Sequence, residues 1–297
     1  MAAATPPTGT GTLDRMEHLQ WSDRPRLRRP VVIAAFEGWN DAGDAATTAA
    51  RWLRDRWAPD ALATIEAEDF FDFTSTRPQV TLTDGVTREI EWPNTDLTWG
   101  STKSVDTIVV VGHEPHLRWR TFCQQVVDVA KAYDARLVLT LGALLAEVPH
   151  TAPVSVIGTA VDEHLIERFG LRRSSYEGPT GIVGVLQDAC GKAGLPAASL
   201  WASVPAYVPG APSPKAALAL VERAAEVLSL GVVTTDLEIA SASYERQVSE
   251  VVADDDEMRE YVSHLEARYN GEVDDDVPSP AQLGEEVERF LRDQRFE

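Results

Sequence analysis

The sequence is poor in cysteine and in basic side chains. Only 2 of its 297 residues are cysteines, Cys123 and Cys190, too few for a disulfide framework or a cysteine-based zinc site. Both lie in segments with a helical pattern, so we expect buried free thiols. Lys and Arg number 27 against 47 Asp and Glu, which gives a formal net charge of -20. Because this charge repels phosphate backbones and anionic lipid, we expect no nucleic-acid partner and no membrane partner.

Long apolar runs and targeting signals are also missing. No run approaches the roughly 18 apolar residues of a membrane-spanning helix. The N-terminal segment "MAAATPPTGTGT" has no basic flank followed by an apolar stretch, so it is not typical of a secretion signal. We expect a disordered or loosely attached tail over residues 1–19 and a cytoplasmic protein.

Familiar catalytic fingerprints are absent as well. The chain contains no G-x-S-x-G, P-loop or dinucleotide-binding motif. The pair His113-x-x-His116 has Pro115 between its members, so the two histidines do not share one helical face and the spacing is unlike that of known metal ligands. We therefore expect no metal and no cofactor.

What the chain does contain is a repeating order of strand and helix. Its 44% hydrophobic residues are enough for a substantial core. Short apolar runs predict strands at 31–36, 61–67, 107–111, 136–141, 154–159 and 200–204. Helical patterns alternate with them at 44–55, 118–133, 162–169, 181–193 and 216–230. Strands apolar on both faces and alternating with helices predict a three-layer α/β/α domain with a mostly parallel sheet over residues 20–235.

Two additions to this domain are expected. Asp84-Gly85 between alternating runs predicts a β-hairpin excursion near residues 80–92. After it, the Pro/Asn-containing segment "PNTDLTWGSTKS" closes the excursion. From residue 236 to residue 297 the apolar spacing of three, four or seven predicts a C-terminal helical extension, with a second helix beginning near "ADDDE" and a last one over 280–292. These helices either pack on the domain or form an arm for assembly.

Polar residues gather in the loops that follow the predicted strands. Because the carboxyl ends of parallel strands share one edge of a sheet, where ligands usually bind, we expect the loops to form one ligand- or partner-binding surface. The candidate residues are Glu37, Trp39, Asn40, Asp41, His113, Glu114, His150, Tyr176, Glu177, Thr180 and Tyr207.

Structural roles compete with binding roles at several of these positions. Asp41 or Asp44 is suited to capping the helix after the first strand. Thr180 is suited to capping the helix that starts near Gly181, although the free amides there would also attract an anion. Carboxylates beside His113 or His150 would suit acid–base work. Trp39 is either a core residue or an exposed contact aromatic.

Five segments in order resemble the proteasome assembly chaperone 2 family, in its bacterial branch. They are "FEGWNDAG", "VVVGHEP", "LGALLAEVPHTAPV", "YEGPTGIVGVL" and "WASVPAYVPGAPSPKAAL", which together reach from about Phe36 to Leu220. The resemblance implies an α/β fold similar to nucleoside phosphorylases and related hydrolases. It also implies self-assembly into a small homo-oligomer, a trimer being one form, and a role for some members in escorting proteasome subunits. It carries over no set of catalytic residues.

The resemblance and the charge together favour an oligomeric protein-binding or assembly factor without established catalysis. An acidic rim with aromatics would attract basic segments of a protein partner, such as proteasome subunits. The alternative is a hydrolase or nucleoside-processing enzyme that uses the loops at the C-terminal edge of the sheet. A phosphorylase-type pocket would need basic groups for phosphate, and the edge loops offer mainly Arg118 and Arg120.

Overall fold

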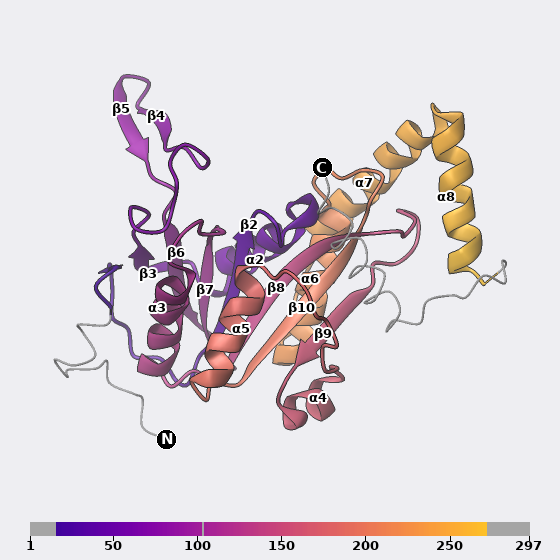
Figure 1. Ribbon diagram of the computed structural model, residues 1–297. Coiled ribbons are helices and arrows are strands. Elements are labelled where there is room, and N and C mark those ends of the chain that lie inside the picture. The colour runs from indigo at the N-terminus through magenta and orange to yellow at the C-terminus, as the bar shows by residue number, and fades with distance from the viewer. Residues whose placement is uncertain (1–15, 103, 272–297) are drawn as a thin grey trace. The chain divides into compact units, whose positions relative to one another are not determined.

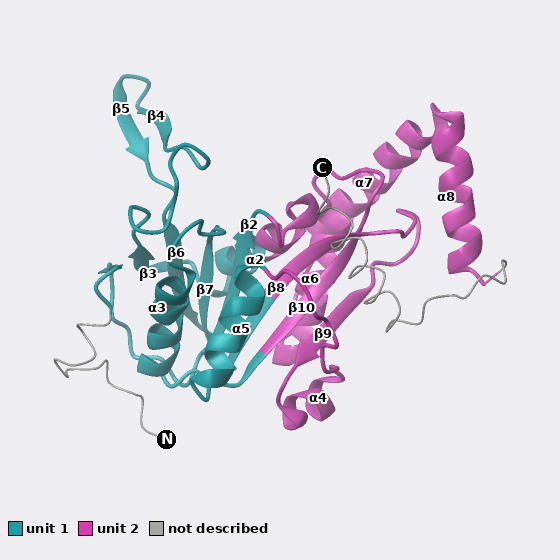
Figure 2. Ribbon diagram, viewed as in Figure 1, with its two compact units in different colours: residues 1–38, 50–140, 181–197 teal, residues 39–49, 141–180, 198–297 magenta. Residues whose placement is uncertain are grey.

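The computed structural model describes residues 16–102 and 104–271. The chain forms two compact units, coloured separately in Figure 2. Unit 1 comprises residues 1–38, 50–140 and 181–197, and unit 2 comprises residues 39–49, 141–180 and 198–297. The division expected from the sequence, at residues 20–235 and 236–297, stays a prediction.

The elements alternate as the sequence predicts over most of the chain (Figure 1). The strands are β1 (Leu19–Trp21), β2 (Val31–Glu37), β3 (Asp60–Ile65), β4 (Gln79–Thr83), β5 (Thr87–Glu91), β6 (Thr95–Ser101), β7 (Asp106–His113), β8 (Leu137–Ala146), β9 (Val156–Ala160) and β10 (Ala197–Pro205). The helices are η1 (Ala42–Asp44), α2 (Ala45–Trp57), α3 (Trp119–Ala132), α4 (Glu163–Phe169), α5 (Ile182–Lys192), α6 (Pro214–Leu228), α7 (Thr235–Ala253) and α8 (Asp256–Tyr269).

The large sheet has eight strands in the order β1-β3-β6-β7-β2-β8-β10-β9. At its centre β2 pairs in parallel with β7 and with β8. At its margins β1, β3, β6 and β7 pair antiparallel in succession, and β9 pairs antiparallel with β10. The α/β class with a parallel centre is therefore confirmed, and the register of β2 against β7 places Glu37 beside His113.

The core of unit 1 explains why β2 is central. Its side chains from Val31 to Phe36 are all buried, as a strand covered on both faces requires. Phe36 meets Phe122 of α3, and Phe122 meets Phe70 in edge-to-face contacts. The helices α3 and α5 lie side by side over these strands (Figure 1).

Two strands of unit 1 are absent from the sequence-based prediction. β6 falls in the segment expected only to close the hairpin excursion, yet it pairs with β3 and β7 along its length. β1 begins at Leu19, where the expected tail ends, and Met16 and Leu19 are buried. The prediction of a loose tail is therefore wrong for residues 16–19, and residues 1–15 lie outside the described part of the chain.

The β4–β5 hairpin forms a separate two-stranded sheet in unit 1. Asp84 and Gly85 both have positive φ, 54° and 72°, and the N–H of Val86 donates to the carbonyl of Thr83 at 3.2 Å. This is the tight turn for which an Asp-Gly pair is favoured.

In unit 2 the helix α6 begins at a Ser213 cap whose hydroxyl accepts from the N–H of Ala216 at 3.3 Å. α7 packs on α6, and α8 contacts α7. Asp255 caps α8 by accepting from the N–H groups of Glu257 and Met258. The first two helices of the expected extension thus pack within unit 2, whereas the predicted helix at 280–292 lies outside the described residues.

No helix in residues 16–102 or 104–271 is long and apolar enough to cross a membrane.

Candidate functional site

The candidate residues are divided between the two units. Glu37, His113 and Glu114 belong to unit 1, and the other eight belong to unit 2. Each group can be described within its own unit, and the single shared surface expected from the sequence stays a prediction.

In unit 1 the ends of β2 and β7 bring Glu37 and His113 together. The Nδ1 atom of His113 lies 2.7 Å from Oε2 of Glu37, and Arg51 of α2 binds the other carboxylate oxygen. The hydrogen bond from His113 is the largest cause that lowers the pKa of Glu37, to about 2, and Arg51 acts in the same direction against the effect of burial. Glu37 is therefore a carboxylate at neutral pH that holds two neighbouring side chains in place.

Glu114 has a structural role at the start of α5. Its Oε1 atom accepts from the N–H of Ile182 at 2.7 Å, while its own N–H donates to the carbonyl of Glu37 at 2.8 Å. Gly181 occupies the N-cap position of α5, and the capping role expected of Thr180 stays a prediction. The Glu114 carboxylate lies 68 residues earlier in the chain and binds a free amide at the start of α5. This is the helix start at which the sequence suggested that an anion would bind.

The two histidines of the His-x-x-His pair face different partners. His113 binds Glu37, whereas Nδ1 of His116 accepts from the N–H of Asp72 at 3.1 Å. Phe71 contacts both imidazole rings edge-on. Within the described residues no group of three or more His, Cys, Asp or Glu is placed to hold a metal ion.

In unit 2 Asp41 braces the turn that leads into α2. Its Oδ1 atom accepts from the N–H groups of Ala46 and Thr47, at 2.6 and 3.2 Å, and its Oδ2 atom accepts from the Thr47 hydroxyl. Asp41 is 5% exposed, and burial raises its pKa to about 6. Of the two acids suited to capping, Asp41 therefore has that role, and Asp44 is exposed.

The same turn holds Asn40 inside and Trp39 outside. The carbonyl of Asn40 accepts from the N–H of Ala143 in β8 at 2.8 Å, and Asn40 is buried. A Cβ at Gly43 would lie 3.1 Å from the carbonyl of Ala211, so only glycine fits there without a shift. Trp39 is 47% exposed. Of the two roles open to Trp39, the exposed aromatic is the one observed.

The segment containing Tyr176, Glu177 and Thr180 is an exposed loop. The hydroxyl of Tyr176 donates to the carbonyl of Pro179 at 2.6 Å. A Cβ at Gly178 would lie 2.6 Å from that hydroxyl, so glycine allows the ring to fold over its own loop. Glu177 and Thr180 are exposed to solvent.

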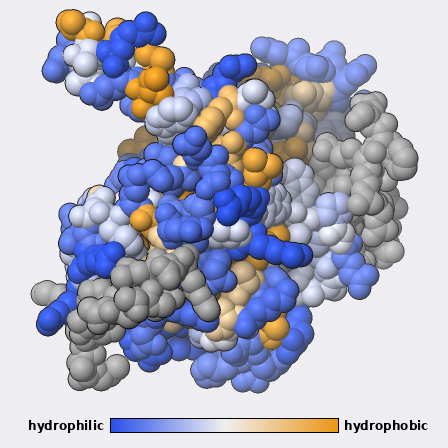
Figure 3. All heavy atoms as spheres, turned by 60° about the vertical axis from the view of Figure 1, so that its left-hand side comes forward, coloured by the Kyte–Doolittle hydropathy of each residue, from blue (hydrophilic) through white to orange (hydrophobic). Residues whose placement is uncertain are grey.

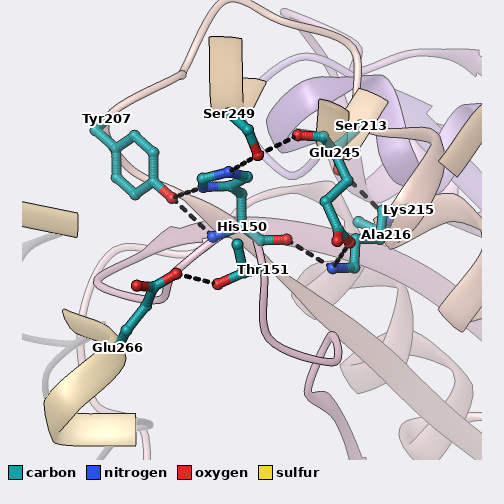
Figure 4. Close-up of polar contacts among 9 residues, drawn as sticks. All are labelled: His150, Thr151, Tyr207, Ser213, Lys215, Ala216, Glu245, Ser249 and Glu266. Carbon is teal, nitrogen blue, oxygen red and sulfur yellow. Dashed lines mark hydrogen bonds and ion pairs between the residues drawn. The ribbon is translucent and has the colours of Figure 1, made fainter. Parts of the chain in front are cut away.

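His150 and Tyr207 belong to a polar network that reaches Ser249 of α7 (Figure 4). The Tyr207 hydroxyl accepts from the N–H of His150 at 2.7 Å and lies 2.8 Å from its Nδ1 atom. Nε2 of His150 lies 2.9 Å from the hydroxyl of Ser249, which donates to the carbonyl of Glu245. This order of donors fits a neutral imidazole that donates through Nε2 and accepts from Tyr207 at Nδ1.

Four further side chains complete the network shown in Figure 4. Lys215 of α6 donates to the carbonyl of His150 at 2.6 Å and pairs with Glu245 of α7 at 2.5 Å. Thr151 donates to Glu266 of α8 at 2.6 Å. The loop after β8 is therefore bound to α6, α7 and α8, and we name these contacts the His150 clamp.

The surroundings of the clamp keep His150 uncharged. Burial is the main cause that lowers its pKa, with Lys215 acting in the same direction and with Glu245 and Glu266 opposing it. Burial also raises the pKa of Tyr207 to about 12. Beside the clamp, Tyr244, Val248 and Val252 of α7 and Val262 of α8 form an apolar cluster, against which Tyr207, Val208, Ala211 and Met258 also pack.

Sequence reasoning identified His150 and Tyr207 but missed Arg51, Lys215, Glu245, Ser249 and Glu266. These residues lie on helices whose polar faces look like ordinary solvent-exposed surface in the sequence. In chemical terms, Asp41, Glu114 and His150 are engaged in holding loops to helices. The arrangement favours loops of fixed conformation that present Trp39 and the Tyr176 segment from unit 2.

The comparisons with known proteins are consistent among themselves. A sequence model described as the PAC2 family matches residues 35–252. No curated protein matches the chain. A PAC2 family protein from Streptomyces avermitilis is 43% identical, with 78% of this chain and 99% of that chain covered and a TM-score of 0.72.

Two proteins of Mycobacterium tuberculosis are also similar in structure. One, described as a proteasome-assembly chaperone homologue, is 44% identical, with 78% of this chain and 99% of that chain covered and a TM-score of 0.71. The other, described as of unknown function, is 26% identical, with 99% of both chains covered and a TM-score of 0.80.

Proposed function

Because the chain belongs to the PAC2 family, we propose that it is an oligomeric protein-binding factor that assists the assembly of other proteins, with proteasome subunits as clients. The observation that carries this proposal is the 44% identity, over 99% of that protein's length, to a protein described as a proteasome-assembly chaperone homologue. Partner binding through chain surfaces, without a chemical step, is the function consistent with that relationship.

The geometry of the candidate residues supports this proposal. Assembly factors need surface features whose conformation is fixed before the partner arrives, since ordering loops on binding costs free energy. Asp41 holds the turn that carries Trp39, and the His150 clamp holds the loop after β8. Exposed aromatic residues on rigid supports are typical energetic centres of protein interfaces. We propose Trp39 as one such centre.

The net charge of the protein indicates which kind of client surface it attracts. With a formal net charge of -20, the protein attracts basic or neutral segments and repels acidic ones. We therefore propose that the client contributes a basic surface to the contact. The proposal also places the protein in the cytoplasm, which is consistent with the two free and buried cysteines Cys123 and Cys190.

The hydrolase alternative is not favoured. It depended on carboxylates and histidines available for acid–base work, and Asp41 and Glu114 instead satisfy backbone N–H groups. His150 is held neutral between Tyr207 and Ser249. The comparisons add no catalytic function to this geometry.

Affinity capture from a native lysate of the source cells tests the proposed function. We expect the tagged full chain to recover proteasome subunits, identified by mass spectrometry. The variant Trp39→Ala should recover at least about tenfold less, because truncating a central aromatic costs more than 1.4 kcal/mol of binding. Leu117→Ala, which changes a side chain of similar exposure, 51% against 47%, serves as the control.

Recovery of the chain alone, with no proteasome subunit, would contradict the proposed client. Equal recovery by the wild-type chain and Trp39→Ala would retain the client but remove Trp39 from the contact. Circular dichroism of both variants guards against loss by unfolding, since an exposed side chain contributes little to stability.

A further inference from the structure

The β4–β5 hairpin has one apolar face that no described part of the chain covers. Val80 pairs with Ile90 across the strands, and Leu82 lies on the same face. These side chains are 52%, 57% and 60% exposed. In Figure 3 hydrophobic residues lie among hydrophilic ones on the segment that projects at the upper left. Because an isolated two-stranded hairpin is marginally stable in water, such a face indicates a missing neighbour.

The two free edges of the hairpin differ in charge. β5 reads Thr-Arg-Glu-Ile-Glu and carries three charged side chains, whereas β4 reads Gln-Val-Thr-Leu-Thr and carries none. Charged side chains are a common protection against unwanted pairing at a sheet edge. The edge of β4 lacks that protection, so it is the edge available for another strand.

We propose that the β4 edge pairs with the β4 strand of a second copy of this chain, antiparallel and centred on Thr81. This inference rests on the proposed oligomeric function and names one surface through which two copies join. A two-fold axis at Thr81 places Val80 opposite Leu82 of the second copy and Gln79 opposite Thr83. Apolar side chains then meet apolar ones, polar side chains meet polar ones, and no charges face each other.

The symmetric register extends the apolar face across both copies. Within one hairpin Ile90 lies beside Val80, and Arg88 lies beside Leu82. Across the axis, a row of side chains runs from Ile90 and Val80 of one copy to Leu82 and Arg88 of the second copy, and the symmetry produces a second such row. Val80 and Leu82 of both copies, four apolar side chains, therefore adjoin at the centre. Joining two hairpins also makes a sheet of four strands, a number at which a sheet with an apolar face becomes stable.

A second copy fits this edge better than the alternative pairing does. The same symmetry applied to β5 would place Glu89 directly opposite Glu89, and like charges opposite each other destabilise a strand pair. Two chains with a net charge of -20 repel one another over most of their surfaces. Association through β4 avoids a further penalty because that strand is uncharged.

Cross-linking of Thr81→Cys tests the pairing directly. Cα atoms opposite each other in an antiparallel pair lie about 4.5–5.5 Å apart, within the roughly 4.4–6.8 Å that a disulfide spans. Under mild oxidation we expect most of this variant to run as a covalent dimer. Thr87→Cys on β5 is the matched control and should stay uncross-linked. The native Cys123 and Cys190 are buried and do not compete.

A second variant tests whether the contact holds the oligomer together. Thr81→Lys puts a lysine opposite Glu89 in its own hairpin, which favours the hairpin, but opposite a second lysine across the axis. Sedimentation velocity should show dissociation at a protein concentration at least about tenfold higher than for the wild-type chain. Thr87→Lys should sediment as the wild-type chain does.

The outcomes separate this inference from the proposed function. An intact oligomer in Thr81→Lys, or equal cross-linking of Thr81→Cys and Thr87→Cys, would overturn the pairing and leave client capture unaffected. If Thr81→Lys keeps its oligomer but loses proteasome subunits, the hairpin faces the client and the second copy is ruled out as its occupant. A wild-type chain that is monomeric at micromolar concentration would overturn the pairing and the proposed oligomer together.

Discussion

The pKa of Asp41 depends strongly on the surroundings of its carboxyl group. It is almost completely buried, yet its carboxylate accepts from Ala46 and Thr47 at the start of α2. The hydrogen bonds favour the charged form, and burial favours the neutral form by a larger margin, so the pKa rises to about 6. The turn that carries Trp39 therefore contains a titrating group close to physiological pH.

Removing this carboxylate should destabilise the fold. In Asp41→Ala the N–H groups of Ala46 and Thr47 lose their acceptor, and we expect the free energy of unfolding to fall by about 1–3 kcal/mol. Urea denaturation at pH 7 measures the change. Asp44→Asn is the control, because Asp44 is exposed and its positive φ of 50° is tolerated by asparagine. Equal stability of the two variants would contradict the bracing role.

The same residue should give the stability a pH dependence of known sign. A carboxyl whose pKa is higher in the folded chain than its ordinary 3.8 takes up its proton first in the folded state. Its contribution to stability is therefore gained as the pH falls through about 6 and is lost again as the pH rises. Relative to Asp41→Asn, the free energy of unfolding of the wild-type chain should increase as the pH falls from 7 to 5.

At the scale of elements, the His150 clamp holds two helices through side chains. α7 and α8 contact the rest of unit 2 through the apolar cluster around Tyr244 and through bonds to His150, Thr151 and Lys215. They add no strand to the sheet. Elements held in this way open locally at a lower free energy than the sheet does.

His150→Ala should therefore loosen α7 and α8 without unfolding the sheet. It removes the imidazole that bridges Tyr207 and Ser249, and we expect amide hydrogen exchange in the two helices to accelerate roughly tenfold or more. His164→Ala, on the exposed helix α4, is the control. Exchange that accelerates equally in β2 and in α7 would indicate global destabilisation and would contradict the clamp.

Acid should loosen the wild-type helices in the same way. Because burial lowers the pKa of His150, the unfolded chain takes up a proton at a higher pH than the folded chain does. The stabilisation is complete above the ordinary pKa of 6.5 and is lost as the pH falls below it. His150→Ala should lack this response between pH 7.5 and pH 5.5.

The elements also show how far sequence reasoning reaches. Continuous apolar runs such as β2 and β7 were predicted because buried parallel strands need little else. β6 was missed because Pro93, Asn94 and Gly100 are typical of a loop. Gly100 is there for another reason, since a Cβ would lie 2.1 Å from the carbonyl of Trp57. A glycine required by close backbone approach cannot be told from a loop glycine in the sequence.

The contacts of the candidate site were predictable where they are local in sequence and were missed where they are long-range. The capping by Asp41 was within reach because it acts over five and six residues. The bond from Glu114 to Ile182 spans 68 residues, and that from His150 to Ser249 spans 99. Such pairs depend on the arrangement of whole elements, which no local pattern records. The chemical types were predicted, and the partners were not.

At the scale of the whole molecule, charge opposes the proposed self-association. If copies join through the uncharged β4 strand, salt should strengthen the oligomer, because the screening length falls from about 10 Å in 0.1 M salt to about 3 Å in 1 M salt. We expect the dissociation midpoint in sedimentation velocity to move to lower protein concentration. Dissociation on adding salt would show that ion pairs hold the copies together instead.

The alternation of the two units along the backbone limits how the chain can be cut. α2 and β8 each straddle a boundary between units, and unit 1 takes its last segment, residues 181–197, from within the stretch that otherwise builds unit 2. No single break yields two self-contained halves, so a deletion series designed to localise a binding region would report misfolding rather than lost contacts. For the same reason recombination could not exchange either half as a module, and surface features can be dissected only by point substitution in the intact polypeptide.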